Sequence, residues 1–436
     1  MIRRLPLSRR FTAASAAFCL CVGIGALFSP PLPVPPLAGE WRGTIASEPE
    51  IGADTWKATV RLEDGTHAKI RFQAFPVYEY GDHLAFSCRL QAPEPIEGFR
   101  YDRYLQSQGI AAACWRPTKV RLVEHAGVSV VGSVLALKQF LVRRLEAAVP
   151  SPASSFLAGI LFGGSSGLGE ETRDAFAQTG LAHILAASGF NVSLFSALFY
   201  GWAAETWGRR RGMPAAVLLL LAYVVMAGGG ASIARAAFMG LLNLAGVALR
   251  RRADPAALVA FSAAALTAWR PLAFAYDPGF QLSFLAFAGL VWLAPHWEDR
   301  FLFLPEAFGI RASFTASLAA CVLTAPVLAW HFNQLSVAAP LANLVVLPFV
   351  TPLMGLAALA LAGAVLRPVL GTLLGLPAWG LAAALLRFIG AFGGWLGTWP
   401  SLPRPFVLCV GFLIPVVAIW LTKRACASSS PVSRSR

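Results

Sequence analysis

HILAASGFNVSLF, residues 183–195, lies inside a longer apolar stretch that is hydrophobic enough to cross a bilayer as a helix. The segment nevertheless carries His183, the step Ser188–Gly189 and Asn191, which are polar side chains beside a helix-weakening glycine. A break at membrane depth is tolerated where the backbone lines a cavity or is buried in protein. We therefore predict a membrane helix that is interrupted near Ser188 and directs polar groups toward a path.

The composition of the whole chain indicates a polytopic membrane protein. Of the 436 residues, 57% are hydrophobic and 13% are charged, and the mean hydropathy is +0.62. Soluble domains carry roughly 25% charged residues. Apolar runs recur along the chain, and we expect about ten helical spans. They are residues 11–28, 181–206, 213–228, 231–249, 256–271, 279–295, 311–330, 339–365, 371–397 and 404–421.

The net charge of +14 comes from short clusters beside the apolar runs. Residues 38–125 hold 11 Lys+Arg against 12 Asp+Glu, so this polar segment is nearly neutral. Basic clusters beside membrane spans mark the cytoplasmic side. This pattern predicts a cytoplasmic N-terminus and C-terminus, with residues 38–125 outside, and by itself says nothing about nucleic acid. The clusters are Arg3, Arg4, Arg9 and Arg10; Arg209 to Arg211; Arg250 to Arg252; and Lys423, Arg424, Arg434 and Arg436.

The chain is expected to divide into five segments. Residues 1–37 combine a basic start, an apolar run and a proline-rich linker, which predicts a signal anchor. Residues 38–125 form a small β domain, and residues 126–180 include VVGSVLALKQFLVRRLEAAV, an amphipathic pattern typical of an interfacial helix. Residues 181–421 hold the remaining spans, and residues 422–436 are expected to be a disordered basic tail.

The β domain is predicted from alternation. Residues 56–73, WKATVRLEDGTHAKIRFQ, alternate apolar and polar residues on both sides of Asp64–Gly65, which is typical of a hairpin. Shorter strands are expected in GEWRGTIA, HLAFSCRL and GIAAACWRP, with a helical turn near YDRYLQ. About five strands predict a small barrel, of which the OB type is one candidate. OB folds bind single strands through aromatic stacking over a basic groove, but the near-neutral charge leaves a simple extracytoplasmic cap equally open.

Cys88 and Cys114 are the two cysteines of this domain. Outside the cytoplasm a disulfide between them is permitted, and their spacing is not that of a zinc motif. The sequence leaves their pairing open.

Polar side chains recur within the predicted spans. Arg235 lies in ASIARAAFMGLLNLAG, and an arginine in a bilayer costs at least about 2.5–3.5 kcal/mol unless it meets a partner, a wet path or the headgroups. Amides in spans either bond neighbouring helices or line such a path. Asn343 lies between Pro340 and Pro348, which predicts another broken helix. The candidate path residues are Ser188, Gly189, Asn191, Arg235, Gln281, Ser283, Gln334 and Asn343.

Known enzyme motifs are missing from the sequence, so no catalytic activity, metal or cofactor is expected. GGSSGLGEE lacks the lysine of a P-loop, and there is no HExxH motif or dense histidine cluster. Ser188 lacks the G-x-S-x-G elbow of a hydrolase. An intramembrane serine hydrolase that uses Ser188 with His183 or His331 remains an alternative.

Four segments in order resemble the ComEC-type competence proteins. They are TRDAFAQTGLAHILAASGFNV at residues 172–192, SIARAAFMG, DPGFQLSFLAFAGL and FNQLSVAAPLANLVVLPFV. The similarity covers residues 150–365, and the segment FRYDRYLQSQGI resembles part of the OB-like domain of that family. The path residues chosen above match polar positions of the family, with one departure: Asn191 stands where the family usually has histidine, and asparagine cannot take up a charge.

The resemblance implies an inner-membrane channel through which single-stranded DNA enters the cytoplasm during natural transformation. It also implies as partners single-stranded DNA, membrane lipids and other competence proteins, namely a DNA receptor, a cytoplasmic translocation motor and a nuclease. The sequence ends at residue 436 without the metallo-β-lactamase-like domain of longer members, so we expect a separate nuclease. A homo-oligomer and a transporter of another substrate remain open.

Overall fold

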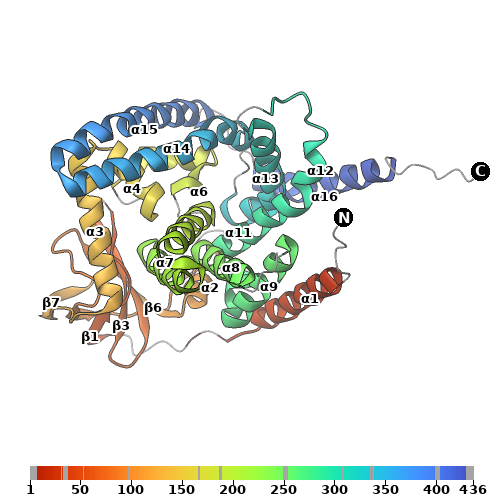
Figure 1. Ribbon diagram of the computed structural model, residues 1–436. Helices are drawn as coiled ribbons and strands as arrows, with labels where there is room; N and C mark the ends of the chain where they lie inside the picture. The colour runs from red at the N-terminus through yellow and green to blue at the C-terminus, as the bar shows by residue number, and fades with distance from the viewer. Residues whose placement is uncertain are drawn as a thin grey trace, which may run out of the picture.

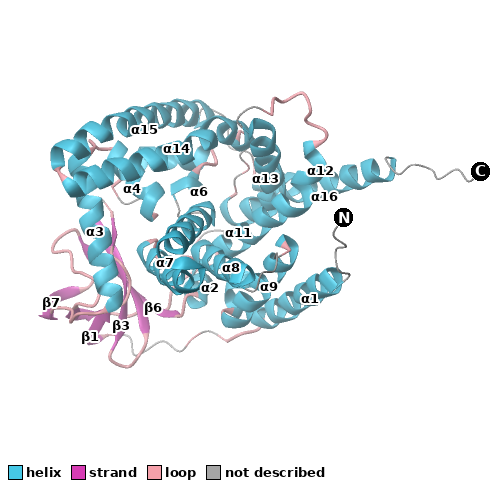
Figure 2. Ribbon diagram, viewed as in Figure 1, coloured by secondary structure: helices cyan, strands magenta, loops and turns pink. Residues whose placement is uncertain are grey.

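The computed structural model has a β domain joined to a large helical body (Figures 1 and 2). The described residues are 7–30, 32, 38–52, 54–96, 99–164, 167–185, 189–248, 254–306, 309–333, 335, 338–397 and 403–428.

A seven-stranded sheet forms the β domain. Its path order is β6-β4-β3-β1-β5-β7, with β2 paired to β3, and every pairing is antiparallel except the parallel pair β4 and β6. All the predicted strands are present, and β2 and β7 are additional. The strands are β1 (Gly39–Ile45), β2 (Glu50–Ile51), β3 (Thr55–Leu62), β4 (His67–Gln73), β5 (His83–Cys88), β6 (Ile110–Cys114) and β7 (Thr118–Glu124).

Alternation along the strands places one set of side chains in a closed core. Trp56, Val60, Ile70 and Phe86 are almost completely buried, and the ring of Trp56 stacks on Phe72 at a centroid distance of 4.1 Å. The predicted hairpin turns at Gly65, whose φ of 84° is a conformation that glycine adopts without strain.

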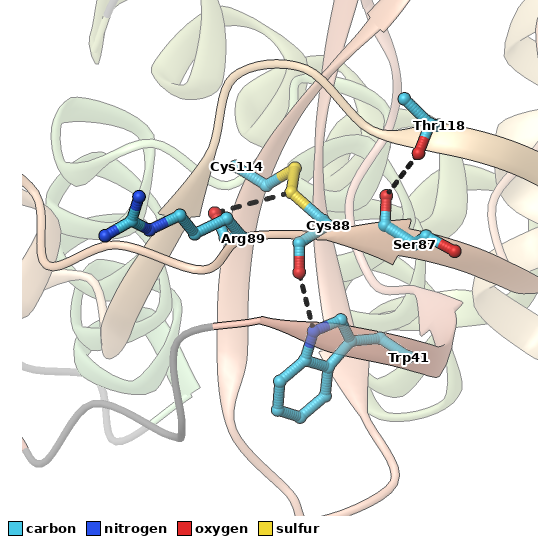
Figure 3. Close-up of a disulfide and its surroundings, with 6 residues drawn as sticks. All are labelled: Trp41, Ser87, Cys88, Arg89, Cys114 and Thr118. Atoms are coloured by element: carbon cyan, nitrogen blue, oxygen red, sulfur yellow. Dashed lines mark hydrogen bonds between the residues drawn. A yellow bond between two sulfur atoms is a disulfide. The ribbon is translucent and has the colours of Figure 1, made fainter.

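Two links join β5 to β6, which are not neighbours in the sheet path. Cys88 and Cys114 form a disulfide with a Cα–Cα distance of 6.5 Å. Just beyond β5, Gln91 makes an antiparallel bridge with Ala113. Figure 3 shows the disulfide beside Trp41, whose indole N–H donates to the backbone oxygen of Cys88 at 3.1 Å. These links draw the sheet toward closure at this end.

Two helices connect the β domain to the helical body. Helix α2 (Tyr101–Ser107) precedes β6 and contacts α10 (Pro271–Tyr276). Helix α3 (Val130–Ala148) begins at Ser129, whose Oγ accepts a hydrogen bond from the N–H of Gly132. It extends from the sheet and crosses α14 (Ala339–Leu366) and α15 (Pro368–Gly397) (Figure 1).

The helical body contains four helical segments that are long and apolar enough to cross a membrane, among the residues that the structure describes. They are Pro278–Glu298, Ile310–Phe332, Ala339–Leu366 and Pro368–Leu396. The protein is therefore a multi-pass membrane protein. The first of these segments consists of α11 (Pro278–Ala288), the π-helical turn η1 (Gly289–Leu293) and α12 (Ala294–Glu298), and the second is α13 (Ile310–Phe332). The other helices are α1 (Leu7–Leu27), α4 (Ala153–Phe162), α5 (Glu170–Gln178), α6 (Ala182–Leu185), α7 (Gly189–Met226), α8 (Ala231–Ala248), α9 (Pro255–Trp269) and α16 (Arg404–Ser428).

Helices α14 and α15 form a close hairpin (Figure 1). A Cβ atom added at Gly371 would lie 2.5 Å from the Cα atom of Ala364, so only glycine permits this approach. Small residues at a membrane interface allow such backbone proximity. The hairpin packs on α4 and α5 through buried Phe156 and Phe176, whose rings lie 5.5 Å apart.

Several segment boundaries differ from those expected. Helix α14 continues through Pro348 and Pro352, so the predicted break beside Asn343 is wrong. A proline removes one backbone donor, and neighbouring groups in a packed bundle can satisfy the carbonyl that it frees. Helix α16 runs to Ser428, whereas the disordered tail was expected from residue 422.

In the opening stretch, α6 ends at Leu185 and α7 begins at Gly189. Residues 186–188 between them lie outside the described part of the chain. Helix α7 itself consists of two helical pieces joined at Gly208, where φ is 77°. This junction falls between the two spans that were expected at residues 181–206 and 213–228.

Candidate functional site

Aromatic side chains form a connected series between the sheet and the helical body. Tyr101 and Tyr104 lie on α2, Phe99 precedes this helix, and Trp115 follows β6. The ring centroids are 6.5 Å apart for Trp115 and Tyr101, 6.1 Å for Tyr101 and Tyr104, and 5.6 Å for Tyr104 and Phe99. These four rings are the aromatic series. Trp115 is 36% exposed, so a ligand in solution can reach this end.

A basic surface lies at the Trp115 end of the series. The guanidinium of Arg71 lies over the Trp115 ring, 5.0 Å from its centroid. Lys57 is the cross-strand partner of Arg71, and Lys69 lies on the same side of β4, paired with Glu50 at 2.7 Å. Burial lowers the pKa of Lys57, the charge of Arg71 lowers it further, and the charges of Glu50 and Lys69 act in opposite directions, Glu50 raising it and Lys69 lowering it. An anion at this surface would relieve that repulsion.

The other end of the aromatic series meets the helical body at His331. The rings of Phe99 and His331 lie 5.6 Å apart in an edge-to-face arrangement. The Nε2 atom of His331 is 3.1 Å from the Oε1 atom of Gln281. The amide nitrogen of Gln281 donates to the carbonyl oxygens of Phe274 and Ala275 at 3.0 and 2.9 Å. Because the amide oxygen must then accept from His331, the histidine carries its proton on Nε2.

Gln281 is held in place by the start of α11. Asp277 caps this helix, since its Oδ1 atom accepts from the backbone N–H groups of Gly279 and Phe280 at 2.8 and 3.3 Å. Asp277 is 9% exposed, and burial raises its pKa. Burial also raises the pKa of Tyr104 to about 12, with a further contribution from the charge of Asp277, so this ring stays neutral at physiological pH.

A polar cluster follows one turn deeper along α11. The hydroxyl groups of Ser283 and of Ser232 on α8 lie 3.2 Å apart. The Arg235 guanidinium lies 5.7 Å from the centroid of the Phe284 ring. Arg235 is 7% exposed, and its buried Nε atom has no hydrogen-bond partner among the residues that the structure describes.

Among the expected path residues, Arg235 and Ser283 therefore lie on facing turns of α8 and α11, while Gln281, two residues before Ser283, bonds to α10 and to His331 on α13. The two asparagines lie elsewhere. The buried Asn191 donates to the backbone oxygen of Ile160 at the end of α4 at 2.7 Å, and the buried Asn343 donates to the Oγ atom of Ser317 on α13 at 2.7 Å.

Other expected residues bear on the hydrolase alternative. Gly189 begins α7. Ser188 and Gln334 lie outside the described residues. His183 contacts the backbone oxygen of Gly180 at 3.1 Å through Nδ1, and His331 is engaged with Gln281. Among the described residues, no group of three His, Cys, Asp or Glu side chains has the arrangement of a metal site.

The aromatic series and Arg71 were not among the residues chosen from sequence. A signal was present, since FRYDRYL places three aromatic residues within six positions and Trp115 directly follows a predicted strand. Aromatic residues of this spacing also occur in ordinary cores. Only the fold brings the rings of α2 between Trp115 and His331.

Comparison with known proteins identifies related sequences for the helical body. A family model described as "Competence protein" matches residues 160–424, which is well over half of the chain. ComE operon protein 3 of Bacillus subtilis (strain 168) is 26% identical over 219 residues. That match covers 50% of this chain and 27% of the relative, so the chain spans much less than the full length of the relative. No solved structure matches the chain significantly.

Proposed function

Because this chain belongs to the competence protein family, whose members take part in DNA uptake during transformation, we propose that it is an inner-membrane channel that imports single-stranded DNA. It contributes no catalytic step in this proposal. Its partners are membrane lipids and other competence proteins, namely a DNA receptor, a cytoplasmic translocation motor and a separate nuclease.

One observation carries the proposal, which is the series of aromatic and polar side chains that leads from the basic sheet surface to helix α11, where the polar cluster also lies. The series runs from Arg71 through Trp115 and the α2 rings to His331 and α11, against which Arg235 also lies. Aromatic rings stack on bases of any sequence, and cations follow the phosphate backbone. In a duplex each base is stacked between its neighbours, so the faces of the bases are not accessible to aromatic side chains. The combination favours a single strand as the substrate.

We assign the β domain to the OB type. Strand β1 pairs with β3 and β5, β3 pairs with β4, and β4 pairs in parallel with β6. The Gln91–Ala113 bridge and the Cys88–Cys114 disulfide link β6 back to β5. OB folds bind oligonucleotides on the face of their second and third strands. In this assignment those strands are β3 and β4, which carry Lys57, Lys69 and Arg71.

The proposed topology places both termini in the cytoplasm, with about ten spans that include the shorter apolar helices. Helices α1 and α16 lie on the side of the molecule away from the sheet (Figure 1). Helix α3 crosses the α14–α15 hairpin, an orientation suited to a helix at the outer interface. In this arrangement the aromatic series lies outside the membrane and leads inward.

The proposal is tested by deleting the gene in a transformable host. Transformation should be lost while labelled DNA still accumulates outside the inner membrane. Normal transformation would refute the proposal and favour a transporter of another substrate.

A point variant tests the aromatic series in the purified full-length protein. Stacking contributes about 1–3 kcal/mol per base, so Trp115→Ala should weaken binding of a thymidine oligonucleotide about 5- to 150-fold. Phe75→Ala is the matched control, because Phe75 is an 85% exposed aromatic residue of the same domain outside the series. If the Trp115 and Phe75 variants bind the oligonucleotide with equal affinity, the aromatic series is not part of the DNA path.

A further inference from the structure

The start of helix α8 is an open, glycine-lined helix N-terminus. It follows Gly228–Gly230 in the sequence GGGASIAR. Gly228 and Gly229 have φ values of 87° and 63°, and a Cβ atom on any of the three glycines would meet open space. The first backbone N–H groups of a helix have no partner within the helix. Gly230 has no side-chain oxygen to accept from them, whereas Asp277 supplies one at α11.

Arg235 supplies a second and independent feature at this place. It is 7% exposed and makes no ion pair or hydrogen bond within the described part of the chain. Desolvating a cation without a counter-charge is unfavourable. Side chains in a helix point back toward its N-terminus, so Arg235 covers the turn that holds Ser232. The guanidinium carbon of Arg235 lies over the ring of Phe284, 5.7 Å from its centroid, and Phe284 directly follows Ser283 in α11.

The hydroxyl groups of Ser232 and Ser283 complete the cluster, since they lie 3.2 Å apart on two different helices. A hydroxyl donates as readily to an anion as to another hydroxyl. The first turns of α8 therefore hold the positive end of the helix dipole, Ser232 and Arg235, and the facing turn of α11 holds Ser283 and the Phe284 ring under the guanidinium. No carboxylate among the described residues ion-pairs with Arg235.

We propose that the N-terminus of α8, together with Arg235, Ser232 and Ser283, forms a binding site for one phosphodiester group. The glycines let a bulky oxyanion approach the backbone, and the bidentate guanidinium suits two phosphate oxygens. This inference rests on the proposed function for its ligand, the strand that follows the aromatic series. A phospholipid headgroup presents the same chemistry, and the experiment separates these two sources.

The test measures binding of a fluorescent thymidine oligonucleotide to the full-length protein in phosphate-free detergent, over a series of salt concentrations. For single strands, each phosphate contact contributes about −0.7 to the slope of log K against log salt. Arg235→Gln should weaken binding about ten- to hundredfold and reduce the magnitude of the slope by about 0.7. Arg235→Lys should keep the slope while losing part of the affinity.

Arg387→Gln is the matched control, because it removes an exposed arginine from the membrane helix α15, away from the cluster. It should leave both the affinity and the slope unchanged. Ala231→Pro removes one N–H at the first position of α8, where proline is tolerated, and should weaken binding several-fold. It tests the backbone contribution without changing any charge.

The inference would be overturned if Arg235→Gln left the slope of log K against log salt unchanged. It would also be overturned if Arg387→Gln reduced that slope as much as Arg235→Gln does. Competition by added phosphatidylglycerol for the Arg235-dependent part of the binding would assign the site to a lipid phosphate and overturn the strand as its ligand. Gene deletion separates the two proposals. If deletion abolishes DNA import while Arg235→Gln keeps the slope, only this inference fails, and if deletion leaves import intact, the proposed function fails.

Discussion

Removing the disulfide of the β domain should loosen the outer end of the aromatic series. The perturbation is the double substitution Cys88→Ser and Cys114→Ser, which leaves no unpaired thiol in the domain. The two cysteines are 26 residues apart, and a closed loop of that length predicts a loss of about 3.5 kcal/mol in the free energy of unfolding of the domain. Trp115 directly follows Cys114, so the local opening of the chain releases the ring that Arg71 covers.

The assay is the rate at which a protease cleaves the β domain in the purified full-length protein. When opening is fast relative to cleavage, the rate follows the population of the open form, so a loss of about 3.5 kcal/mol predicts cleavage roughly 300-fold faster. A reducing agent should accelerate cleavage of the unmodified protein and have no effect on the double variant. Cys21→Ser is the control, since Cys21 is a free, exposed cysteine. Equal resistance of the double variant, or acceleration by the reducing agent in that variant, would refute this reasoning.

Two further predictions concern the contacts along the same series. Gln281→Leu leaves two carbonyl oxygens and the Nε2–H group of His331 without their partner, which should destabilise the protein by about 2–4 kcal/mol; an unchanged melting temperature in detergent would contradict this. Lys57 has a lowered pKa in the free protein, and a bound phosphate favours its charged form. Oligonucleotide affinity should therefore be greatest below that pKa and decline as the pH rises through it, measured between about pH 7 and pH 10, whereas Lys57→Arg should show no such decline.

Five strands of the β domain could be predicted because each of them has buried positions that alternate with more exposed ones. The period of two in residues 56–73 reports that burial directly, and the structure has β3 and β4 there. Strand β7 was missed because it has no fully buried position along its length, so its sequence carries little pattern. The additional pairing arises from backbone contacts with β5, which no side-chain period records.

Helix boundaries in the membrane body were harder to predict, because apolar runs mark length and depth but not interruptions. Pro348 and Pro352 suggested a break in the sequence, yet α14 continues through them. Gly208, where the two helical pieces of α7 join, does fall between the spans expected at residues 181–206 and 213–228, because Arg209 to Arg211 interrupt the apolar run there. Backbone groups in a bundle are satisfied by neighbours that are distant in sequence, and a single segment contains no information about them.

The candidate site divides in the same way. Arg235, Gln281 and Ser283 stood out because polar groups are costly in an apolar helix. In the structure Ser283 contacts α8, Arg235 lies over the Phe284 ring of α11, and Gln281 contacts His331 of α13. Asn191 stood out for the same reason, but its amide satisfies the end of α4. The free-energy cost of a polar group in an apolar helix therefore identifies side chains that need a partner. Only the fold shows whether that partner belongs to the protein or is a ligand.

A path for a moving strand requires contacts that are individually modest, because a substrate must leave each position as readily as it enters. The aromatic series meets this condition, since stacking on neutral rings is tolerant of sequence and is repeated over several neighbouring rings. If only the ligand stabilised the Arg235 cation, the proposed site would bind a phosphodiester group too tightly for the strand to move on. The Phe284 ring offsets part of that demand by cation–π attraction when the site is empty. Replacing Phe284 with leucine should therefore tighten oligonucleotide binding while slowing release, and faster release in that variant would show that the ring orients the guanidinium rather than sharing its charge.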